Sequence, residues 1–467
     1  MKTKIPFLLL VSALFVLFYS CRQSAPADTV ASEPITYPRV QEWAEDAVIY
    51  EVNIRQYTPE GTFRAFMEHL PRLKALGVDL LWFMPIHPIS ETNRKQGLGS
   101  YYAASDYKAI NPEFGTMEDF DALVDAVHRL GMHMIIDWVP NHTGWDHVWI
   151  KAHPEWYTQD SLGNIVDPIN PETGESWGWT DVADLNYDNQ DMRLEMISDM
   201  LFWVDKHKID GFRCDVAHGV PNDFWVQCRD SIYKRQALFM LAESEIPENR
   251  NNGTFVMTYA WEFHHLMNDI AQGKRQVNAI DTMLAQSRER FHKGYGMYFT
   301  SNHDENTWSG TEFERMGDAS EVMAVLSFTI DGMPLIYSGQ EEPLRKRLRF
   351  FEKDTIPFKT FSNAPMYQKL TALKHQMTCL QTKVEGNTVA ERINVSEDVY
   401  AFERGNGMDK IVVLLNLSSK PQETTLTKGY EGLYNLFDQD GPESLPSGQA
   451  IALDPWDYKV YTNKPIQ

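Results

Sequence analysis

Eight short apolar segments alternate with amphipathic helical patterns between about residues 45 and 375. Strand-like runs that alternate with helices predict βα units and a parallel sheet, and eight such units are the number that closes a barrel. A chain of 467 residues is long enough for this barrel and for additions to it. The expected strands are residues 47–52, 80–83, 133–139, 209–215, 239–243, 254–259, 297–301 and 335–337.

The helical patterns between the strands have recognisable ends. Thr116 followed by Asp119 predicts a capping box, and the apolar stripe after it ends at Gly131. An earlier stripe ends at Gly77 and consists of Phe66, Leu70, Leu73 and Leu76. Both patterns predict helices that cover the outside of a barrel with one apolar face.

Two stretches break this alternation. Residues 143–189 leave the end of the third strand and are rich in Trp, Asn, Asp, Gly and Pro, which predicts a small inserted subdomain. After about residue 380 the pattern changes to alternating strands that are separated by turn residues. We therefore predict an α/β barrel over residues 45–378, with the insertion, followed by a C-terminal antiparallel β-sandwich over residues 380–467.

The N-terminus carries an export signal. Two lysines precede an almost unbroken apolar run, residues 5–18, and a serine then leads to Cys21. This pattern predicts a secretory signal peptide over residues 1–20, and the small residue before Cys resembles a bacterial lipoprotein cleavage site. Residues 21–44 are expected to form a tether. We expect an exported protein, held at the membrane only by a lipid on Cys21; ordinary signal-peptidase cleavage is the alternative. With no acidic cluster after Cys21, the periplasmic face is favoured over the cell surface.

The composition of the chain limits the classes of molecule that it can bind. The formal net charge is −22, from 65 acidic and 43 basic residues, which argues against nucleic acid because phosphate binding requires clustered Lys and Arg. Aromatic residues make up 12% of the chain; their rings stack well on flat sugar faces, although most aromatic side chains fill cores. Cys214, Cys228 and Cys379 show no CxxC spacing, so neither a zinc site nor a disulfide framework is predicted.

Three acidic side chains, Asp215, Glu243 and Asp304, stand where expected strands end. Arg213 faces the same side of its strand as Asp215, so the guanidinium is expected to hold that carboxylate ionised for nucleophilic attack. Glu243 follows four apolar residues, and burial should raise its pKa, as a general acid near neutral pH requires. His303 next to Asp304 suits a grip on sugar hydroxyls. Taken singly, these residues also fit a structural ion pair, a cap and a turn.

Four segments fall in order on expected strands three, four, five and seven: DWVPNH at 137–142, GFRCD at 211–215, LAE at 241–243 and NHD at 302–304. This ordered set resembles the α-amylase family of glycoside hydrolases, family 13. DLN at 184–186 and MPLIYSGQE at 333–341 also match. The resemblance covers roughly residues 45 to 463, and it implies a (β/α)8 TIM barrel with a subdomain inserted after strand 3 and a C-terminal β-sandwich.

The resemblance also implies roles for single residues. Asp215 would be the nucleophile, Glu243 the acid/base, and Asp304 the carboxylate that stabilises an oxocarbenium-like transition state. Asp137 would be a structural support. The residues that would bind the sugar are Tyr102, His142, Arg213 and His303. The implied reaction is a double displacement with retention, for which the two working carboxyls stand about 5–5.5 Å apart.

Two positions depart from the common family pattern. Three and four residues after the nucleophile, many members carry a Lys-His pair, where this chain has His218 and Gly219. This change leaves specificity on the leaving-group side open. The resemblance further implies a structural Ca²⁺ with Asn141 as a ligand, the Gly219 carbonyl as a second, and Asp184 or Asp181 completing an oxygen cage.

We therefore predict an enzyme that cleaves α-1,4-glucosidic bonds in starch, maltodextrins or related α-glucans. A cyclomaltodextrinase- or neopullulanase-type hydrolase, or an α-glucan transglycosylase, has the same catalytic residues and is the alternative within enzymes. From another class, the alternative is an inert glucan-binding lipoprotein, which the presence of all three acids disfavours.

Overall fold

The computed structural model describes residues 41–170, 173–438 and 441–467. The predicted signal peptide (1–20), Cys21 with its predicted lipid, and the tether as far as residue 40 lie outside these residues. Among the helices that are described, none combines the length and the apolar character needed to cross a membrane. The described residues all belong to one compact unit.

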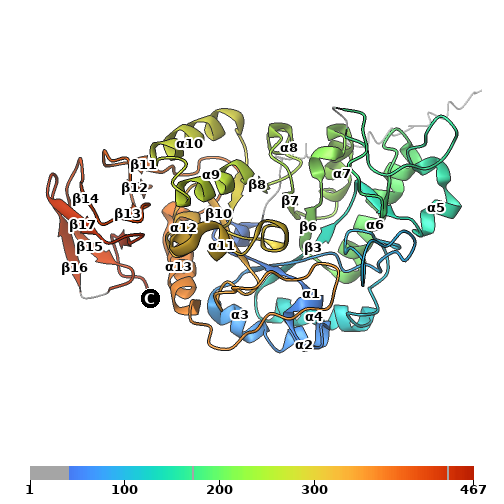
Figure 1. Ribbon diagram of the computed structural model, residues 1–467, viewed down its shortest axis with the longest axis horizontal. Coiled ribbons are helices and arrows are strands. Elements are labelled where there is room, and N and C mark those ends of the chain that lie inside the picture. Colours follow the sequence, from blue (N-terminus) through green and yellow to red (C-terminus); the bar gives the residue numbers. More distant parts are fainter. Residues whose placement is uncertain (1–40, 171–172, 439–440) are drawn as a thin grey trace, which may run out of the picture. The chain divides into compact units, whose positions relative to one another are not determined.

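Eight parallel strands close into a barrel, which confirms the predicted fold class (Figure 1). Around the barrel their order is β1-β10-β9-β8-β7-β6-β3-β2. Their bounds are β1 Ile49–Val52, β2 Leu80–Phe83, β3 His133–Trp138, β6 Gly211–Cys214, β7 Phe239–Ala242, β8 Met257–Tyr259, β9 Tyr295–Tyr298 and β10 Gly332–Tyr337. Strand β9 starts and ends earlier than predicted, so residues 299–301 belong to the loop that follows it.

Helices lie around the barrel strands, apart from α5, which belongs to the insertion (Figure 1). Their bounds are α1 Ile54–Tyr57, α2 Phe63–Met67, α3 Leu70–Leu76, α4 Met117–Arg129, α5 Val148–Ala152, α6 Gln190–His207, α7 Asn222–Ile232, α8 Pro247–Asn251, α9 Trp261–Ala271, α10 Asn278–Arg290, α11 Glu312–Met316, α12 Ser320–Thr329 and α13 Ala364–Gln376. The predicted capping box of Thr116 and Asp119 is present at α4. The stripe that ends at Gly77 forms two helices, α2 and α3, where a single helix was predicted.

Alternate residues of the barrel strands face two different cores. One set fills the barrel interior with large side chains that include Ile49, Trp82, Ile135, Leu241, Tyr259, Met297 and Leu335. The other set packs against the surrounding helices and includes Tyr50, Leu81, Phe83, Ile136, Phe212, Met240 and Ile336. The filled interior keeps the barrel closed to a ligand, so a site must lie at an end of the strands.

The chain between β3 and α6 forms the predicted insertion, which contains the two-stranded sheet of β4 (His142–Gly144) and β5 (Val182–Asp184) and helix α5. The C-terminal strands make a six-stranded antiparallel sheet, β11-β12-β13-β18-β15-β16, and a two-stranded one, β14-β17. Their bounds are β11 Glu391–Arg392, β12 Val399–Gly405, β13 Lys410–Asn416, β14 Gln422–Thr425, β15 Tyr430–Asn435, β16 Pro442–Leu445, β17 Ala450–Leu453 and β18 Tyr458–Thr462.

Residues 42–44 correct the predicted tether boundary at residue 44. They form a short 3-10 helix (Glu42–Ala44), Ala44 is fully buried, and the Trp43 ring stacks on His133 with ring centroids 3.7 Å apart. Apolar burial of this kind anchors the chain to the barrel, so the tether ends before Glu42. The three described cysteines, Cys214, Cys228 and Cys379, are buried, and no disulfide joins them.

Candidate active site

A cavity of about 350 Å³ lies where the barrel strands end in their carboxyl termini. Six of the seven residues predicted to be catalytic or to bind sugar line it: Tyr102, His142, Asp215, Glu243, His303 and Asp304. The seventh, Arg213, is completely buried and contacts two of the three predicted catalytic acids. The structure thus brings all seven residues into one site.

Arg213 is the centre of this site. Its Nη1 lies 2.8 Å from both Asp137 Oδ1 and Asp215 Oδ1, and its Nη2 lies 3.0 Å from Glu243 Oε2. Its Nε donates to the Tyr259 hydroxyl at 3.2 Å. Although burial disfavours the charge, the surrounding acids raise the pKa of Arg213 well above its usual value. One fixed cation therefore orients three carboxylates at once.

The pKa values of Asp215 and Glu243 differ from the sequence prediction. Burial and the neighbouring Glu243 charge raise the pKa of Asp215 well above its usual range. Burial opposes the charge on Glu243 too, but Arg213 and the Val216 N–H lower the pKa of Glu243. The two side chains share a hydrogen bond. Both directions are opposite to the sequence prediction, which expected an ionised Asp215 and a raised pKa for Glu243.

Val216 contributes a backbone donor that the sequence did not reveal. Its φ of 43° and ψ of 42° lie in the left-handed region, which is unfavourable for a β-branched residue and costs on the order of 1–3 kcal/mol. In this conformation its N–H donates to Glu243 Oε2 at 2.8 Å. The strain therefore coincides with a hydrogen bond that stabilises the ionised form of Glu243.

His303 links Asp304 to a buried acid that the sequence prediction missed. Its Nδ1 lies 2.5 Å from Glu51 Oε1, and its Nε2 lies 2.8 Å from the Tyr102 hydroxyl and 3.3 Å from Asp304 Oδ2. Burial lowers the pKa of His303, but Asp304 and Glu51 raise it to about 9. His303 is therefore a cation at neutral pH. The available signal for Glu51 was an acid inside the apolar run of the first strand.

Tyr102 and His142 form part of the cavity wall. The Tyr102 ring stacks on Phe350 with centroids 6.3 Å apart and an interplanar angle of 6°. The His142 ring meets Trp179 edge-on at 5.7 Å, and burial lowers the pKa of His142 to about 4. A neutral imidazole can both donate and accept hydrogen bonds, as contacts with sugar hydroxyls require.

Aromatic side chains extend the wall outward, and the sequence prediction singled out none of them. Trp179 lines the cavity and stacks on Trp177, with centroids 5.6 Å apart and an angle of 15°. On another part of the wall, the ring centroids of Trp308 and Phe350 lie 5.4 Å apart. Trp177 is 44% exposed and Trp308 is 55% exposed, which is unusual for such large apolar rings. Both present faces on which a sugar can stack.

His218 stands where many family members have a lysine. It is exposed, and its Nδ1 lies 3.4 Å from the backbone oxygen of Glu243. The imidazole therefore lies beside the backbone of the predicted acid/base and does not line the cavity.

The calcium site expected from the sequence stays a prediction. Asn141 Oδ1 lies close to Gly219, where an added Cβ would meet it at 2.6 Å. Asp181 is instead paired with Lys95 at 2.9 Å, and burial raises the pKa of Asp184 to about 6. Among the described residues, no three His, Cys, Asp or Glu side chains are grouped to hold a metal. Asn141 and the Gly219 carbonyl are not of these four side-chain types, so this observation does not decide the expected site, and no step of the reaction depends on Ca²⁺.

Comparisons with known proteins agree with this geometry. Residues 35–356 match the family model for the α-amylase catalytic domain. α-Amylase MalA of Haloarcula japonica is 27% identical over 425 residues, and the match covers 87% of this chain and 60% of the relative. Probable oligo-1,6-glucosidase 2 of Bacillus subtilis is 26% identical, with 64% of this chain and 65% of the relative covered. The chain thus matches less than two thirds of the length of these curated relatives.

A solved structure is also similar. The maltogenic α-amylase AmyB from Thermotoga neapolitana superposes with a TM-score of 0.80 at 28% identity, and the match covers 90% of this chain and 99% of that one. The family model covers well over half of the chain. The chain therefore belongs to the α-amylase family of glycoside hydrolases.

Proposed function

We propose that this protein hydrolyses α-1,4-glucosidic bonds in starch, maltodextrins or related α-glucans by double displacement. The observation that carries the proposal is the placement of Asp215, Glu243 and Asp304 on one cavity. Arg213 holds the first two of these acids together. A structural ion pair would need one acid beside Arg213, whereas this cation contacts three and two of them face the cavity.

In the first step, a carboxylate oxygen of Asp215 attacks the anomeric carbon and the bond to the leaving oxygen breaks. Glu243 gives its proton to that oxygen, so the departing sugar leaves as an alcohol. A hydrogen bond joins Glu243 to Asp215, so a proton can pass between the two carboxyls before the attack. A glycosidic oxygen beside Glu243 favours this transfer, because it accepts the proton during bond breaking.

In the second step, Glu243 removes a proton from water, and the water oxygen attacks the anomeric carbon. The ester bond to Asp215 breaks, and its carboxylate is restored with overall retention. Positive charge that develops on the sugar ring is stabilised by the Asp304 carboxylate. Tyr102, His142 and His303 would orient the ring in the cavity that they line.

The walls of the cavity support a chain of sugars as the substrate. Tyr102, Trp179, Trp308 and Phe350 give aromatic surface on more than one side of the three acids. One relative is named an α-amylase and another a probable oligo-1,6-glucosidase, so the α-1,4 linkage is part of the proposal. The alternative is a cyclomaltodextrinase- or neopullulanase-type hydrolase or a transglycosylase, in which a sugar hydroxyl replaces water in the second step.

The location of the protein is also proposed. We propose that the protein is exported and that a lipid on Cys21 holds it at the periplasmic face. Both proposals rest on the sequence alone. Mass spectrometry of the mature N-terminus tests them: a diacylglyceryl-modified Cys21 is expected, and an unmodified N-terminus at another residue would contradict the anchor.

The function is tested with the purified mature chain on amylose, pullulan, β-cyclodextrin and maltoheptaose, beside an Asp215→Asn control. We expect shorter maltooligosaccharides from at least one substrate and none from the control. NMR of the first product is expected to show the α-anomer, as retention requires. Folded protein that leaves all four substrates intact would contradict the proposal, and retention on immobilised starch would then favour the binding protein.

A further inference from the structure

Asp304 occupies a short loop between β9 and a single turn of π-helix (Glu305–Ser309). Its side chain is 35% exposed to the cavity, and Oδ2 lies 3.3 Å from His303 Nε2. The position of this carboxylate therefore depends largely on the backbone that carries it. The question is what holds that backbone in place.

Arg315, on α11, contacts the loop on both sides of Asp304. Its Nη2 donates to the Thr300 carbonyl at 2.7 Å, four residues before Asp304. Its Nε donates to the Gly310 carbonyl at 2.8 Å, six residues after Asp304. One side chain thus holds the beginning and the end of the segment that carries Asp304.

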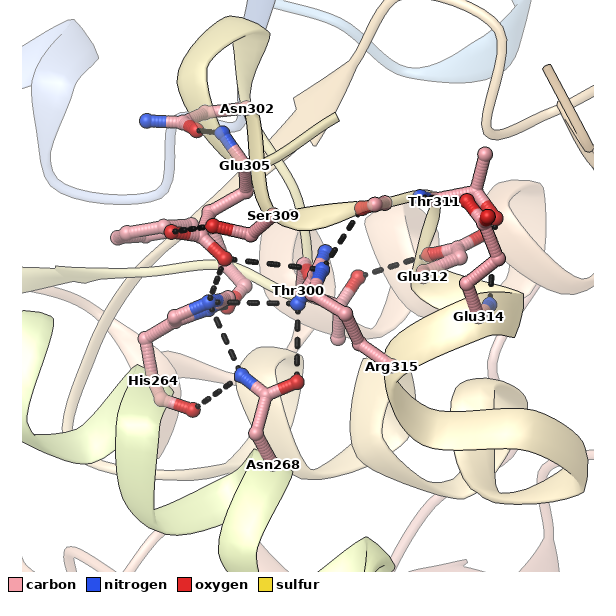
Figure 2. A network of polar contacts seen from close by, with 12 residues as sticks. His264, Asn268, Thr300, Asn302, Glu305, Ser309, Thr311, Glu312, Glu314 and Arg315 are labelled. Carbon is pink, nitrogen blue, oxygen red and sulfur yellow. Dashed lines mark hydrogen bonds and ion pairs between the residues drawn. The ribbon is translucent and has the colours of Figure 1, made fainter. Parts of the chain in front are cut away.

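A third contact joins Arg315 to the residue next to Asp304. Arg315 Nε lies 3.6 Å from Glu305 Oε2, and Figure 2 shows the Glu305 side chain directed toward Arg315 and His264. The Glu305 N–H donates to Asn302 Oδ1 at 2.8 Å, which tightens the turn around Asp304. Glu305 and Asp304 are neighbours, but one contacts Arg315 while the other lines the cavity.

Two further side chains orient Arg315. Asn268 Oδ1 accepts from Arg315 Nη1 at 3.0 Å, and Asn268 Nδ2 lies 3.0 Å from His264 Nε2 (Figure 2). His264 Nδ1 lies 3.0 Å from the Phe299 carbonyl, so α9 also holds the loop. Arg315 is 8% exposed and His264 is 1% exposed. A planar guanidinium fixed in this way presents its donors in one geometry.

We propose that Arg315 is a positioning residue for the proposed reaction, which sets the place of Asp304 and His303 by holding Thr300, Glu305 and Gly310. This inference rests on the proposed function, because Asp304 matters only if sugar bonds are cleaved. Arg315 does not line the cavity, so it acts through the loop and does not touch the sugar.

The other end of β9 offers a matched control. Arg250 is 7% exposed, its Nε donates to the Lys293 carbonyl at 2.8 Å, and its Nη2 donates to the Gly294 carbonyl at 2.9 Å. Arg250 and Arg315 are thus two buried arginines that hold carbonyls at opposite ends of one strand. Arg315 is at the end that carries Asp304, whereas Arg250 is far along the chain from it.

The test compares Arg315→Met with Arg250→Met in the full mature chain. Because a displacement of about 1 Å can reduce a rate by about 100-fold, Arg315→Met is expected to lower kcat on maltoheptaose by about that factor with KM changed less. Arg250→Met is expected to lower Tm by a similar amount and to leave kcat within about threefold. Arg315→Lys, which keeps one charged donor, is expected to give an intermediate kcat, and it replaces Arg315→Met if that variant does not fold.

Hydrogen exchange provides a second readout that does not require activity. Peptides that span residues 300–310 are expected to exchange faster in Arg315→Met and at the wild-type rate in Arg250→Met. Equal kcat values for the two folded methionine variants, or unchanged exchange over 300–310, would overturn the positioning role. An inactive wild-type protein would instead refute the proposed function, and the exchange comparison would still decide whether Arg315 holds the loop.

Discussion

Buried cations lie at both ends of the barrel, and they differ in what surrounds them. At the carboxyl ends of the strands, Arg213 is enclosed by carboxylates, which raise its pKa. At the amino ends, Lys374 donates to the carbonyls of Gly332 and Leu380, and burial lowers its pKa well below the usual value. Arg250 also holds carbonyls, and burial lowers its pKa to about 10.

The difference separates two uses of a buried charge. A buried cation that donates to neutral carbonyls holds the backbone in place. Its burial lowers the stability of the fold, because the charge is removed from water. A cation among carboxylates keeps its charge and sets the ionisation of its neighbours in return. Chemistry is expected to depend on the cation at the carboxyl end, and stability alone on those at the amino end.

The largest expected effect comes from Arg213→Lys. Lysine keeps the charge but lacks the planar fork that reaches Asp137, Asp215 and Glu243 together, so kcat is expected to fall by about 100-fold or more. Initial rates on maltoheptaose measure this change, with circular dichroism as the check on folding. A folded variant with kcat within about fivefold of wild type would show that the buried cation at the carboxyl ends of the strands is no more important for catalysis than those at the amino ends.

Glu51→Gln tests the charge on His303. With Glu51 ionised, the pKa of His303 is about 9, so above that pH the imidazole loses the Nε2 proton that it can donate to a sugar. The alkaline limb of kcat/KM is therefore expected near pH 9 in the wild type and at lower pH in the variant. The free energy of unfolding is also expected to fall as the pH rises through 9, because a histidine whose folded-state pKa is raised contributes stability only while it is protonated. An unmoved alkaline limb would contradict this role.

Trp177→Ala tests the outer wall of the cavity. If a distant sugar stacks on this ring, kcat/KM for maltoheptaose is expected to fall about threefold to tenfold, with little change for maltotriose. Leu162→Ala is the control, because Leu162 lies in the same insertion and is 85% exposed. Equal losses on short and long substrates would show that Trp177 contributes no separate sugar subsite.

Lys374→Met is expected to change the pH dependence of stability and not activity. Because the folded-state pKa of Lys374 is lowered, the unfolded chain binds more protons than the folded chain at pH values between the two pKa values. The free energy of unfolding therefore rises with pH up to the unfolded pKa, about 10.4, in the wild type. The variant should lack this rise in urea titrations at a series of pH values, with kcat within about twofold. A loss of activity in folded protein would contradict the comparison.

The smallest expected effect is that of chelation. Because Asp181 is already paired with Lys95, removal of Ca²⁺ by EDTA is expected to leave Tm within about 1 °C. Differential scanning fluorimetry with EDTA and with added CaCl₂ measures this. A rise of several degrees with CaCl₂ would show that Asn141 and its neighbours do form a calcium site.

The barrel could be predicted because its signal is local. The alternation of strands and helices is present in every βα unit, and Asp215, Glu243 and Asp304 each follow an apolar run directly. The structure brings these three acids together because parallel strands place their carboxyl ends on one side of a barrel. The start of β9 was predicted too late in the chain because its first two residues, Tyr295 and Gly296, lack a strong apolar pattern.

What could not be predicted depends on contacts between distant segments. The lowered pKa of Glu243 depends on the Val216 N–H and on the Arg213 guanidinium, and no sequence pattern predicts how these groups are placed. Glu51 joins the site through a residue 252 positions later. The exposed faces of Trp177 and Trp308 become apparent only when their neighbours are in place.

The apolar core that surrounds the barrel continues into the C-terminal sheets. It includes Tyr400, Phe402, Ile411 and Val413, and Arg404 on β12 donates to the Thr329 and Ile330 carbonyls at the end of α12. A chain that ended after α13 would expose this apolar face to water and leave those carbonyls without their donor. We therefore expect a chimera that takes its C-terminal sheets from a relative to need the matching barrel helices from the same relative.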